Sequence, residues 1–272
     1  MFKKALLTLF SLILYCAPSL EAKPVEFVIV IPSYNNENFY QGNLDSCFNQ
    51  TYPHFSVYYI NDLSSDETGS LVDKYIKEHK LENKCTVVHN TERKGALRNF
   101  HEAIHKIAPH KIIVNVDGDD RLAHPQVLER IAKVYKNKKT WLTYGSFVAE
   151  PESYTRIHCK AFPKEVIRRR TFRKHKWVSS HLRTFKAGLF HKIKKEDLMF
   201  KGKFFPTAGD LAWMYPMLEM ASKGHFSFIN ETLYIYNAQN PLNDFRDPKQ
   251  TQVFFRSIIQ AKKPYKPLKR LP

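Results

Sequence analysis

The chain has 272 residues, of which 43% are hydrophobic and 14% aromatic, and its formal net charge is +17. This composition excludes an intrinsically disordered chain, and the length suffices for one large domain or two small ones, each with a core. The excess of positive charge favours an anionic partner: a nucleotide, an acidic acceptor, a membrane surface or nucleic acid.

Residues 1–22 have the pattern of a signal peptide. Lys3 and Lys4 precede an apolar run from residue 5 to residue 17, and a candidate cleavage site follows Ala22. The apolar run is short for a membrane span, so a cleaved signal is favoured over a signal anchor. We therefore expect a protein of the secretory pathway or the extracytoplasmic space, with a membrane-anchored protein as the alternative.

Strand-like and helix-like segments alternate after this region. Runs of β-branched apolar residues predict strands, and apolar residues at helical spacing predict the helices between them. In chain order these are strand 25–31, helix 35–50, strand 55–60, helix 66–79, strand 85–88, helix 95–107, strand 111–116, helix 125–135 and strand 141–147. The alternation predicts an α/β fold with a mostly parallel sheet and helices on both faces.

Three of the predicted strands end in polar clusters, at residues 32–35, 61–62 and 117–120. Ligands of such sheets bind beyond the carboxyl ends of the strands, so these clusters should converge on one crevice. The last cluster, Asp117-Gly118-Asp119-Asp120, holds three carboxylates that repel one another unless a cation lies between them. Mg²⁺ and Mn²⁺ prefer such oxygen ligands, although an acidic turn is the structural alternative. No glycine-rich phosphate loop is visible, which disfavours a dinucleotide-dependent dehydrogenase and a P-loop enzyme.

Four short motifs together resemble the inverting family-2 glycosyltransferases, which have the GT-A fold. The motifs are Ile31–Asn35, Asn61–Thr68, Lys94–Asn99 and Asp117–Asp120. The resemblance extends throughout residues 25–125 and, less closely, to Asn243. It implies a Rossmann-like GT-A domain with an acceptor-side region after the sheet. The implied division is 23–245 for the domain, with a nucleotide-sugar half at 23–125, an acceptor half at 126–245 and a basic C-terminal tail at 246–272.

The resemblance also assigns residues to the binding of a nucleotide sugar. The assigned residues are Pro32, Tyr34, Asn35, Asp62, Arg98, Asp117 and Asp120. In this interpretation Asp62 accepts a hydrogen bond from the base, which is typically uracil in the family, and Arg98 lies beside the nucleotide. Asp119 and Asp117 would hold Mn²⁺ or Mg²⁺, with His181 as a further candidate ligand. The structural alternatives are a half-buried aromatic for Tyr34 and a turn or cap residue for Asp62.

An inverting transfer needs a base that takes the proton of the attacking hydroxyl. The family places a catalytic carboxylate at the start of a helix, often as one of two consecutive acids. Here Asp210 precedes the helical pattern of residues 211–221, and Gly209 stands in place of the first acid. We interpret Asp210 as the base, with a simple helix cap as the alternative. Arg183 lies in a second polar cluster and is a candidate to neutralise phosphate or an acidic acceptor.

The sequence therefore predicts metal-dependent transfer of a sugar from a nucleotide-sugar donor to a hydroxyl of an unidentified glycan, lipid or protein. A nucleotidyltransferase would share the sheet and the carboxylates, but residues 33–41 lack its glycine-rich basic loop. A non-catalytic module for anionic surfaces would explain the charge but not the ordered acidic motifs. The basic run at 168–176 suits an anionic membrane surface or an acidic acceptor. Nucleic acid is disfavoured as a partner, because the carboxylate cluster would repel phosphate unless a metal is bound.

Overall fold

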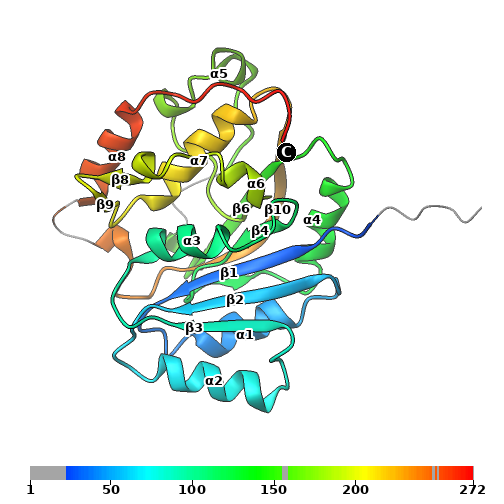
Figure 1. Ribbon diagram of the computed structural model, residues 1–272, viewed down its shortest axis with the longest axis vertical. Helices are drawn as coiled ribbons and strands as arrows, with labels where there is room; N and C mark the ends of the chain where they lie inside the picture. Colours follow the sequence, from blue (N-terminus) through cyan, green and yellow to red (C-terminus); the bar gives the residue numbers. More distant parts are fainter. Residues whose placement is uncertain (1–22, 155–158, 247–248, 250, 272) are drawn as a thin grey trace, which may run out of the picture.

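The structure is a computed structural model that describes residues 23–154, 159–246, 249 and 251–271 (Figure 1). Residues 1–22, on which the expected signal peptide depends, lie outside these described residues. Within the described part of the chain, no helix combines the length and the hydropathy that a membrane span requires. An eight-stranded sheet organises this part of the chain, with the strand order β3-β2-β1-β4-β7-β6-β10-β5.

The first four strands of this order form a parallel sheet, as predicted. They are β3 (Cys85–His89), β2 (Phe55–Asn61), β1 (Phe27–Ser33) and β4 (Ile112–Asn115). The helices that connect them along the chain are α1 (Tyr40–Phe48), α2 (Thr68–Glu78) and α3 (Ala96–Ile104). Ser33 pairs with Asn61 in the register of β1 and β2, so the polar segments that follow both strands begin at the same edge of the sheet.

The second half of the sheet is mixed. Its strands are β7 (Arg183–Lys186), β6 (Leu142–Glu150), β10 (Phe226–Asn237) and β5 (Arg121–Leu122). β6 and β10 are parallel, whereas β7 runs antiparallel to both β4 and β6, and β5 runs antiparallel to β10. The sequence did not predict β7, because its charged ends hide the strand pattern. Its buried Thr184 is satisfied inside the sheet by hydroxyl hydrogen bonds with Thr143 (2.6 Å) and Tyr135 (3.0 Å).

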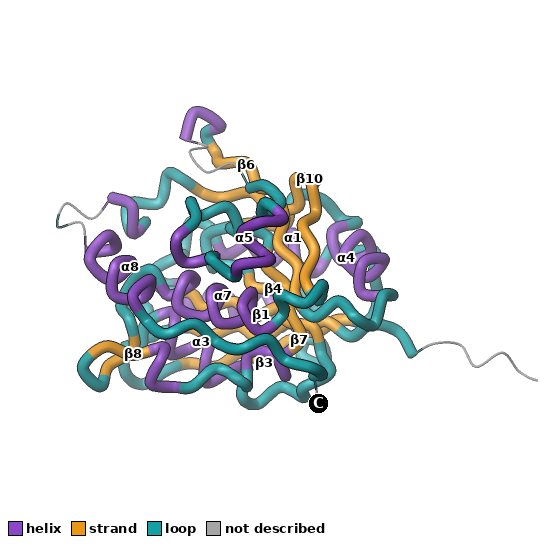
Figure 2. The backbone as a smooth tube through the Cα atoms, turned by 90° about the horizontal axis from the view of Figure 1, so that it is seen from above, coloured by secondary structure: helices purple, strands orange, loops and turns teal. Residues whose placement is uncertain are grey.

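Helices cover both faces of the sheet, which confirms the predicted α/β architecture. Alternate residues of β1 enter different cores, since successive side chains of a strand point to opposite faces. Ile29 and Ile31 pack with α1, α2 and α4 (Val127–Tyr135), while Val28 and Val30 pack with α3 and α7 (Gly209–Met220). α7 is buried along nearly its whole length, and it contacts α3 and α8 (Thr251–Ala261) (Figure 2).

The remaining elements are shorter. They are α5 (Lys164–Arg169), α6 (Ala187–Phe190), β8 (Met199–Phe200), β9 (Lys203–Phe204), α8 (Thr251–Ala261) and 3₁₀ helices at Glu152–Tyr154, Phe172–Lys174, Lys195–Leu198 and Asp244–Arg246. β8 and β9 form a separate two-stranded sheet.

The C-terminal segment, which we expected to be a basic tail at 246–272, packs as part of the fold. Ile259 of α8 is fully buried, and its carbonyl accepts a hydrogen bond from Arg173 (2.7 Å). Tyr265 donates its backbone N–H to the buried carboxylate of Glu219 (2.8 Å), and Leu268 donates its own to the carbonyl of Met220 (2.9 Å). Basic composition suggested a solvated tail, but the apolar residues between the lysines hold this segment on α7.

Candidate active site

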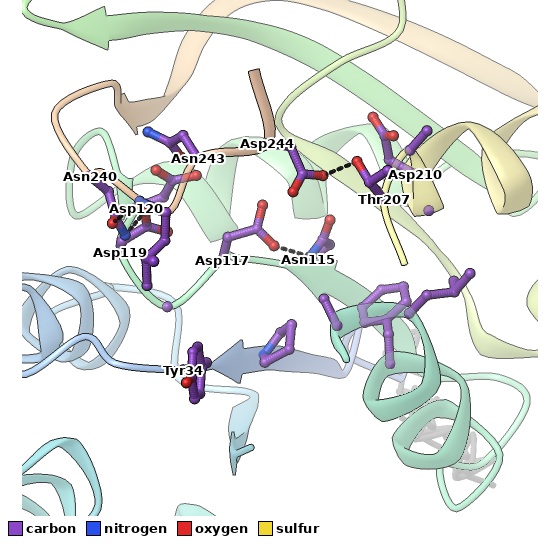
Figure 3. A pocket seen from close by; sticks show the side chains of 18 of the residues that line it. Tyr34, Asn115, Asp117, Asp119, Asp120, Thr207, Asp210, Asn240, Asn243 and Asp244 are labelled. Carbon is purple, nitrogen blue, oxygen red and sulfur yellow. Dashed lines mark hydrogen bonds between the residues drawn. The ribbon is translucent and has the colours of Figure 1, made fainter. Parts of the chain in front are cut away.

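A cavity of about 360 Å³, here called the first cavity, lies at the carboxyl ends of β1 and β4 (Figure 3). It brings together most of the residues that the sequence assigned to function. Those that line it are Pro32, Tyr34, Asp117, Asp119, Asp120, His181, Arg183 and Asp210. Asn35, Asp62 and Arg98 were assigned to the same site but are not in its wall. The predicted convergence of strand ends therefore holds for the ends of β1 and β4.

The acidic loop at 117–120 is held in shape from β10. The hydroxyl of Tyr234 accepts the backbone N–H of Asp117 (3.0 Å) and donates to the carboxylate of Asp120 (2.7 Å). The other oxygen of Asp120 accepts the backbone N–H of Asn237 (2.7 Å), and Asn240 donates to Asp119 (2.7 Å). The sequence analysis did not identify these partners. The alternating segment Leu233-Tyr234-Ile235-Tyr236-Asn237 does carry a signal, because it is a strand pattern with polar groups on one face.

The electrostatics of this loop favour a bound cation or a proton. Burial raises the pKa of Asp117 to about 6, with Asp119 adding to the rise and the nearby Arg183 opposing it. Burial, followed by the neighbouring carboxylates, also raises the pKa of Asp120 well above its ordinary value. Ionising the whole cluster without a counter-charge is therefore unfavourable.

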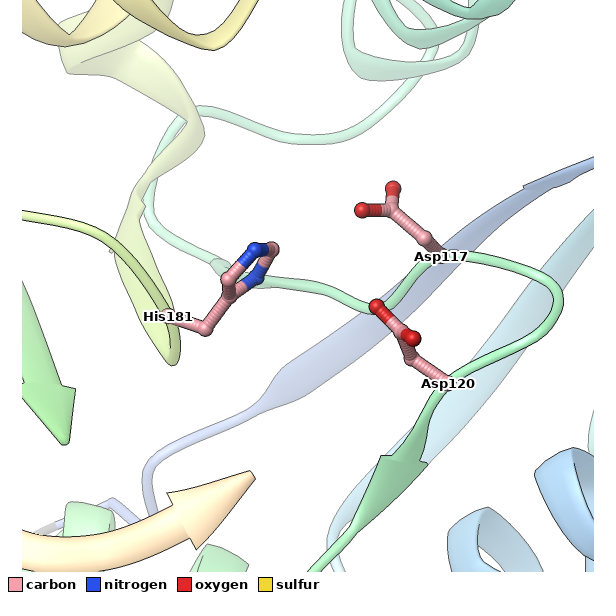
Figure 4. Close-up of side chains that lie close together, drawn as sticks. All are labelled: Asp117, Asp120 and His181. Atoms are coloured by element: carbon pink, nitrogen blue, oxygen red, sulfur yellow. The ribbon is translucent and has the colours of Figure 1, made fainter. Parts of the chain in front are cut away.

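Asp117, Asp120 and His181 form a group with the spacing of a metal site (Figure 4). One ligand atom from each lies within 4.8 Å of the others, and the three side chains come from two segments of the chain. The ring of His181 is buried and stacks on Tyr234 with centroids 4.4 Å apart. Its Nδ1 has no hydrogen-bond partner among the described residues, and burial followed by the charge of Arg183 holds the pKa of His181 well below its ordinary value. A neutral imidazole with a free nitrogen beside two carboxylates fits a divalent cation.

Asp62 directly follows β2 and is buried, and its carboxylate holds the loop at residues 90–95 in place. Its carboxylate accepts hydrogen bonds from the backbone N–H groups of Lys94 and Gly95 (both 2.9 Å) and from the side chains of Asn90 (2.8 Å) and Arg93 (2.7 Å). Burial alone would raise the pKa of Asp62, but the surrounding donors outweigh it and hold this pKa below its ordinary value. Gly95 has φ +78°, a conformation that glycine adopts without strain.

Arg93, which the sequence analysis did not single out, connects Asp62 with Tyr34. Its guanidinium lies 3.3 Å from the centre of the Tyr34 ring while it bonds Asp62. Arg98 instead forms ion pairs with Glu102 (2.8 Å) and Glu92 (3.0 Å). Neighbouring residues of a helix point about 100° apart, and Leu97 is the one that faces the cavity. Arg93 therefore lies beside Tyr34, whereas Arg98, which we expected beside the nucleotide, pairs with Glu92 and Glu102.

Asn35 does not line the first cavity, but its hydrogen bonds hold the segment beside it. Its backbone has φ +52°, its N–H donates to the hydroxyl of Ser64 (3.0 Å), and its side-chain oxygen accepts the N–H of Ser65 (2.9 Å). These bonds tie the segment after β2 to the segment after β1.

Asp210 lies in the first turn of α7, across the first cavity from the acidic loop (Figure 3). Ala208 is the residue that caps α7, so the alternative that Asp210 is the cap is wrong. One oxygen of Asp210 accepts a hydrogen bond from buried Arg183 (2.7 Å), and the other accepts one from the backbone N–H of Leu211 (2.9 Å). A Cβ on Gly209 would come 3.2 Å from Cβ of Leu97, so the close approach of α3 explains why no acid stands there.

Comparison with known proteins identifies the family. The model for glycosyl transferase family 2 matches residues 28–196, more than half of the chain. The chain belongs to glycosyltransferase family 2. The family and the GT-A fold that the motifs predicted are thereby confirmed.

This family-2 glycosyltransferase resembles proteins from bacteria and archaea. It is 25% identical to the glycosyltransferase GlyG of Streptococcus pneumoniae over 224 residues, which are 78% of this chain and 70% of GlyG. Its fold matches S. aureus TarS 1–349 in complex with UDP-GlcNAc (TM-score 0.56, 17% identity), covering 78% of this chain and 58% of that one. It also matches the mannosyltransferase PcManGT of Pyrobaculum calidifontis with GDP-Man and Mn²⁺ (TM-score 0.58, 18% identity), covering 89% and 66%. The chain thus spans less than two thirds of both solved proteins.

A second cavity of about 410 Å³ in this family-2 glycosyltransferase meets the first at Asp210. The two cavities also share Arg183 and His181 in their walls. Trp177 lies in the wall of the second cavity, whereas Trp213 lines the first. Asp210 is therefore accessible from two spaces of different composition.

Proposed function

We propose that this protein transfers a sugar, with inversion, from a nucleoside-diphosphate sugar to a hydroxyl group of an acceptor. The observation that carries this proposal is the position of Asp210, which faces the acidic loop across the first cavity and also borders the second. In this proposal one cavity holds the donor, the other holds the acceptor, and Asp210 borders both. Membership of glycosyltransferase family 2 supports this assignment over a nucleotidyltransferase or a non-catalytic anion-binding module.

The donor would lie in the first cavity, with its base at Tyr34 and Pro32. Tyr34 and Pro32 line the cavity, and Arg93, which lies over the Tyr34 ring and pairs with Asp62, supplies hydrogen-bond donors beside them. We propose a UDP-sugar as the donor, which agrees with the UDP-GlcNAc complex of TarS. The GDP-Man complex of PcManGT makes a GDP-sugar the alternative.

Mn²⁺ or Mg²⁺ would be held by Asp117, Asp120 and His181, with Asp119 beside them in the same wall. A bound cation of this kind neutralises the charge that develops on the departing diphosphate. The chain holds these oxygen and nitrogen ligands close together. Ionising the buried carboxylates is unfavourable, as the raised pKa values of Asp117 and Asp120 indicate, and a bound cation would offset this free-energy cost.

Asp210 would act as the general base. It takes the proton of the acceptor hydroxyl while the hydroxyl oxygen forms its bond to the sugar and the bond between the sugar and the diphosphate breaks. Arg183 keeps the carboxylate oriented through one oxygen, and the backbone N–H of Leu211 donates to the other.

The test is turnover of a panel of UDP-sugars and GDP-Man by the purified chain with Mn²⁺, measured as release of nucleoside diphosphate and sugar. We expect one donor to be hydrolysed slowly and EDTA to stop the release. Asp210→Asn should lower transfer roughly 10²–10⁴-fold and leave UDP binding within about twofold, because Asp210 does not hold the nucleotide. The same substitution at exposed Asp73 is the matched control. Full turnover by Asp210→Asn would remove this residue from the mechanism, and release of pyrophosphate would favour a nucleotidyltransferase.

We also propose that residues 1–22 direct the chain out of the cytosol, on the pattern of Lys3, Lys4 and the apolar run. Fractionation of expressing cells tests this, combined with N-terminal sequencing of the product. An N-terminus at Lys23 is the expected result, and an intact cytosolic chain would contradict it.

A further inference from the structure

The second cavity has one aromatic wall. Phe147, Trp177 and Tyr236 line it, and Trp177 is buried with its ring edge-on to Tyr215 at a centroid distance of 5.3 Å. Fixed rings of this kind form flat apolar surfaces against which the carbon face of a sugar or polyol packs. The cavity therefore has the shape and surface of a binding site for an organic molecule that reaches Asp210.

The wall of the same cavity holds three cations and two carboxylates. Lys176 and Arg256 line it, and neither forms an ion pair with any residue that the structure describes. The third cation of the wall, Arg183, is already neutralised by Asp210 at 2.7 Å. Asp244 is the other carboxylate of the wall, and it accepts a hydrogen bond from Thr207.

The two cations come from separate parts of the chain. Lys176 is exposed and precedes Trp177 in the segment before β7, while Arg256 is half-buried on α8. The packing of α8 on α7, through Ile259, fixes the helix that carries Arg256. Two cations from distant segments thus line the same cavity as Asp210.

We propose, building on the proposed transfer reaction, that the second cavity takes the acceptor and that this acceptor carries an anionic group. Lys176 and Arg256 bind a phosphate or carboxylate of the acceptor, the aromatic wall packs against its carbon skeleton, and its hydroxyl lies at Asp210. Charge complementarity selects the acceptor class, because an anionic group gains charged hydrogen bonds from Lys176 and Arg256 that a neutral acceptor does not.

The test compares matched pairs of probes that differ in charge: glycerol 3-phosphate with glycerol, and glucuronate with glucose. Their binding to the full chain with UDP and Mn²⁺ is measured by saturation-transfer NMR, so the readout does not depend on turnover. We expect the charged member of each pair to bind roughly tenfold more tightly. Vesicles of phosphatidylglycerol and of phosphatidylcholine form a further arm. Preference for the anionic vesicles with weak binding of glycerol 3-phosphate would place the anion on a lipid headgroup.

The double variant Lys176→Met/Arg256→Gln should reduce the preference for charged probes to within about twofold, since both charged hydrogen-bond donors are lost. Lys176→Arg/Arg256→Lys should keep the preference and so separates charge from packing. Lys136→Gln/Lys223→Met removes two exposed cations that line neither cavity and is the matched control. Thermal unfolding of each variant verifies that it folds.

Equal binding of charged and neutral probes by the unmodified chain would overturn the inference, as would a preference that survives the double variant. The protein could instead show a charge preference that depends on Lys176 and Arg256 but turn over no sugar nucleotide. That result would overturn the proposed transfer reaction and support only a site that binds anions. The two failures are therefore distinguishable.

Discussion

Arg183 and Asp210 form an ion pair between β7 and α7, with 2.7 Å between the guanidinium nitrogen and the carboxylate oxygen. Arg183 is buried and also donates to the side-chain oxygen of Asn115 (3.2 Å) at the end of β4. It is thus a positioning residue that fixes Asp210 relative to the acidic loop. Its charge also reaches Asp117, whose pKa it lowers against the effect of burial.

Replacing Arg183 with Gln should therefore shift the pH dependence of Mn²⁺ binding to higher pH, by roughly one unit. Burial raises the pKa of Asp117 to about 6, and the loss of the nearby cation would raise it further. Because a carboxylate binds the cation in its ionised form, a higher pKa requires a higher pH for binding. Electron paramagnetic resonance of free Mn²⁺ between pH 5 and 8 measures the midpoint. An unchanged midpoint would show that Arg183 does not act on Asp117.

His181→Gln should weaken Mn²⁺ binding in the presence of UDP by about tenfold or more, because it removes a nitrogen ligand of the proposed cluster. The matched control is His79→Gln, since His79 stacks on Tyr75 of α2. Direct titration of Mn²⁺ measures both variants.

Substitutions of Asp119 and Asp120 distinguish two sets of metal ligands. The structure groups Asp120 with Asp117 and His181, whereas the sequence motif implies Asp119. The geometry of the cluster gives Asp120→Asn the larger loss of Mn²⁺ affinity, whereas the family resemblance gives it to Asp119→Asn. The same titration decides between them. A larger loss with Asp119→Asn would assign Asp120 to supporting the loop through Tyr234 and Asn237.

Gly118→Ala should destabilise the protein by about 1–3 kcal/mol, as overpacking does in other cores. A Cβ on Gly118 would lie 2.5 Å from the hydroxyl oxygen of Ser33 and 2.7 Å from the amide nitrogen of Asn36, so the acidic loop must move. Urea unfolding measures the change. Gly42→Ala in α1 is the control: its Cβ meets only Arg121 at 3.4 Å, and alanine in a helix should stabilise by up to about 1 kcal/mol.

Arg173→Met should destabilise the protein by about 3–5 kcal/mol, because it leaves the charge of Glu219 buried without its partner. The pair is bidentate, at 2.6 and 3.0 Å, and both side chains are almost fully buried. The double variant Arg173→Met/Glu219→Met should unfold at a higher urea concentration than the single variant, since no isolated charge remains. A single variant as stable as the parent would mean that the segment at 259–268 does not depend on this pair.

The strands of the first half were predictable because they are local patterns. β1 and β4 are unbroken apolar runs that end in polar residues, and parallel strands place those ends at one edge. β7 was not predictable in the same way. Arg183 and Thr184 are polar yet buried, and they are tolerated in the centre of the sheet because Asp210 and Thr143 satisfy them from other segments.

The site was predictable for those residues that belong to short sequence motifs. The carboxylates of the acidic loop and Asp210 were identified from their residue types and positions. Arg93 was missed because a sequence motif does not reveal which side chain of the loop before α3 lies over Tyr34. Asn240 was missed because its contacts with Asn36 and Asp119 cross 204 and 121 positions of the chain.

The support of the acidic loop has a consequence for how the chain reaches its native state. The groups that satisfy Asp119 and Asp120 arrive from β10 and residue 240, more than 110 positions later in synthesis. Contacts of such long sequence separation form late, since much conformational entropy must be lost before they are gained. A nascent chain that has folded only its first four strands therefore lacks the partners of its acidic loop, and the loop reaches the geometry proposed for cation binding only in the last stages of folding.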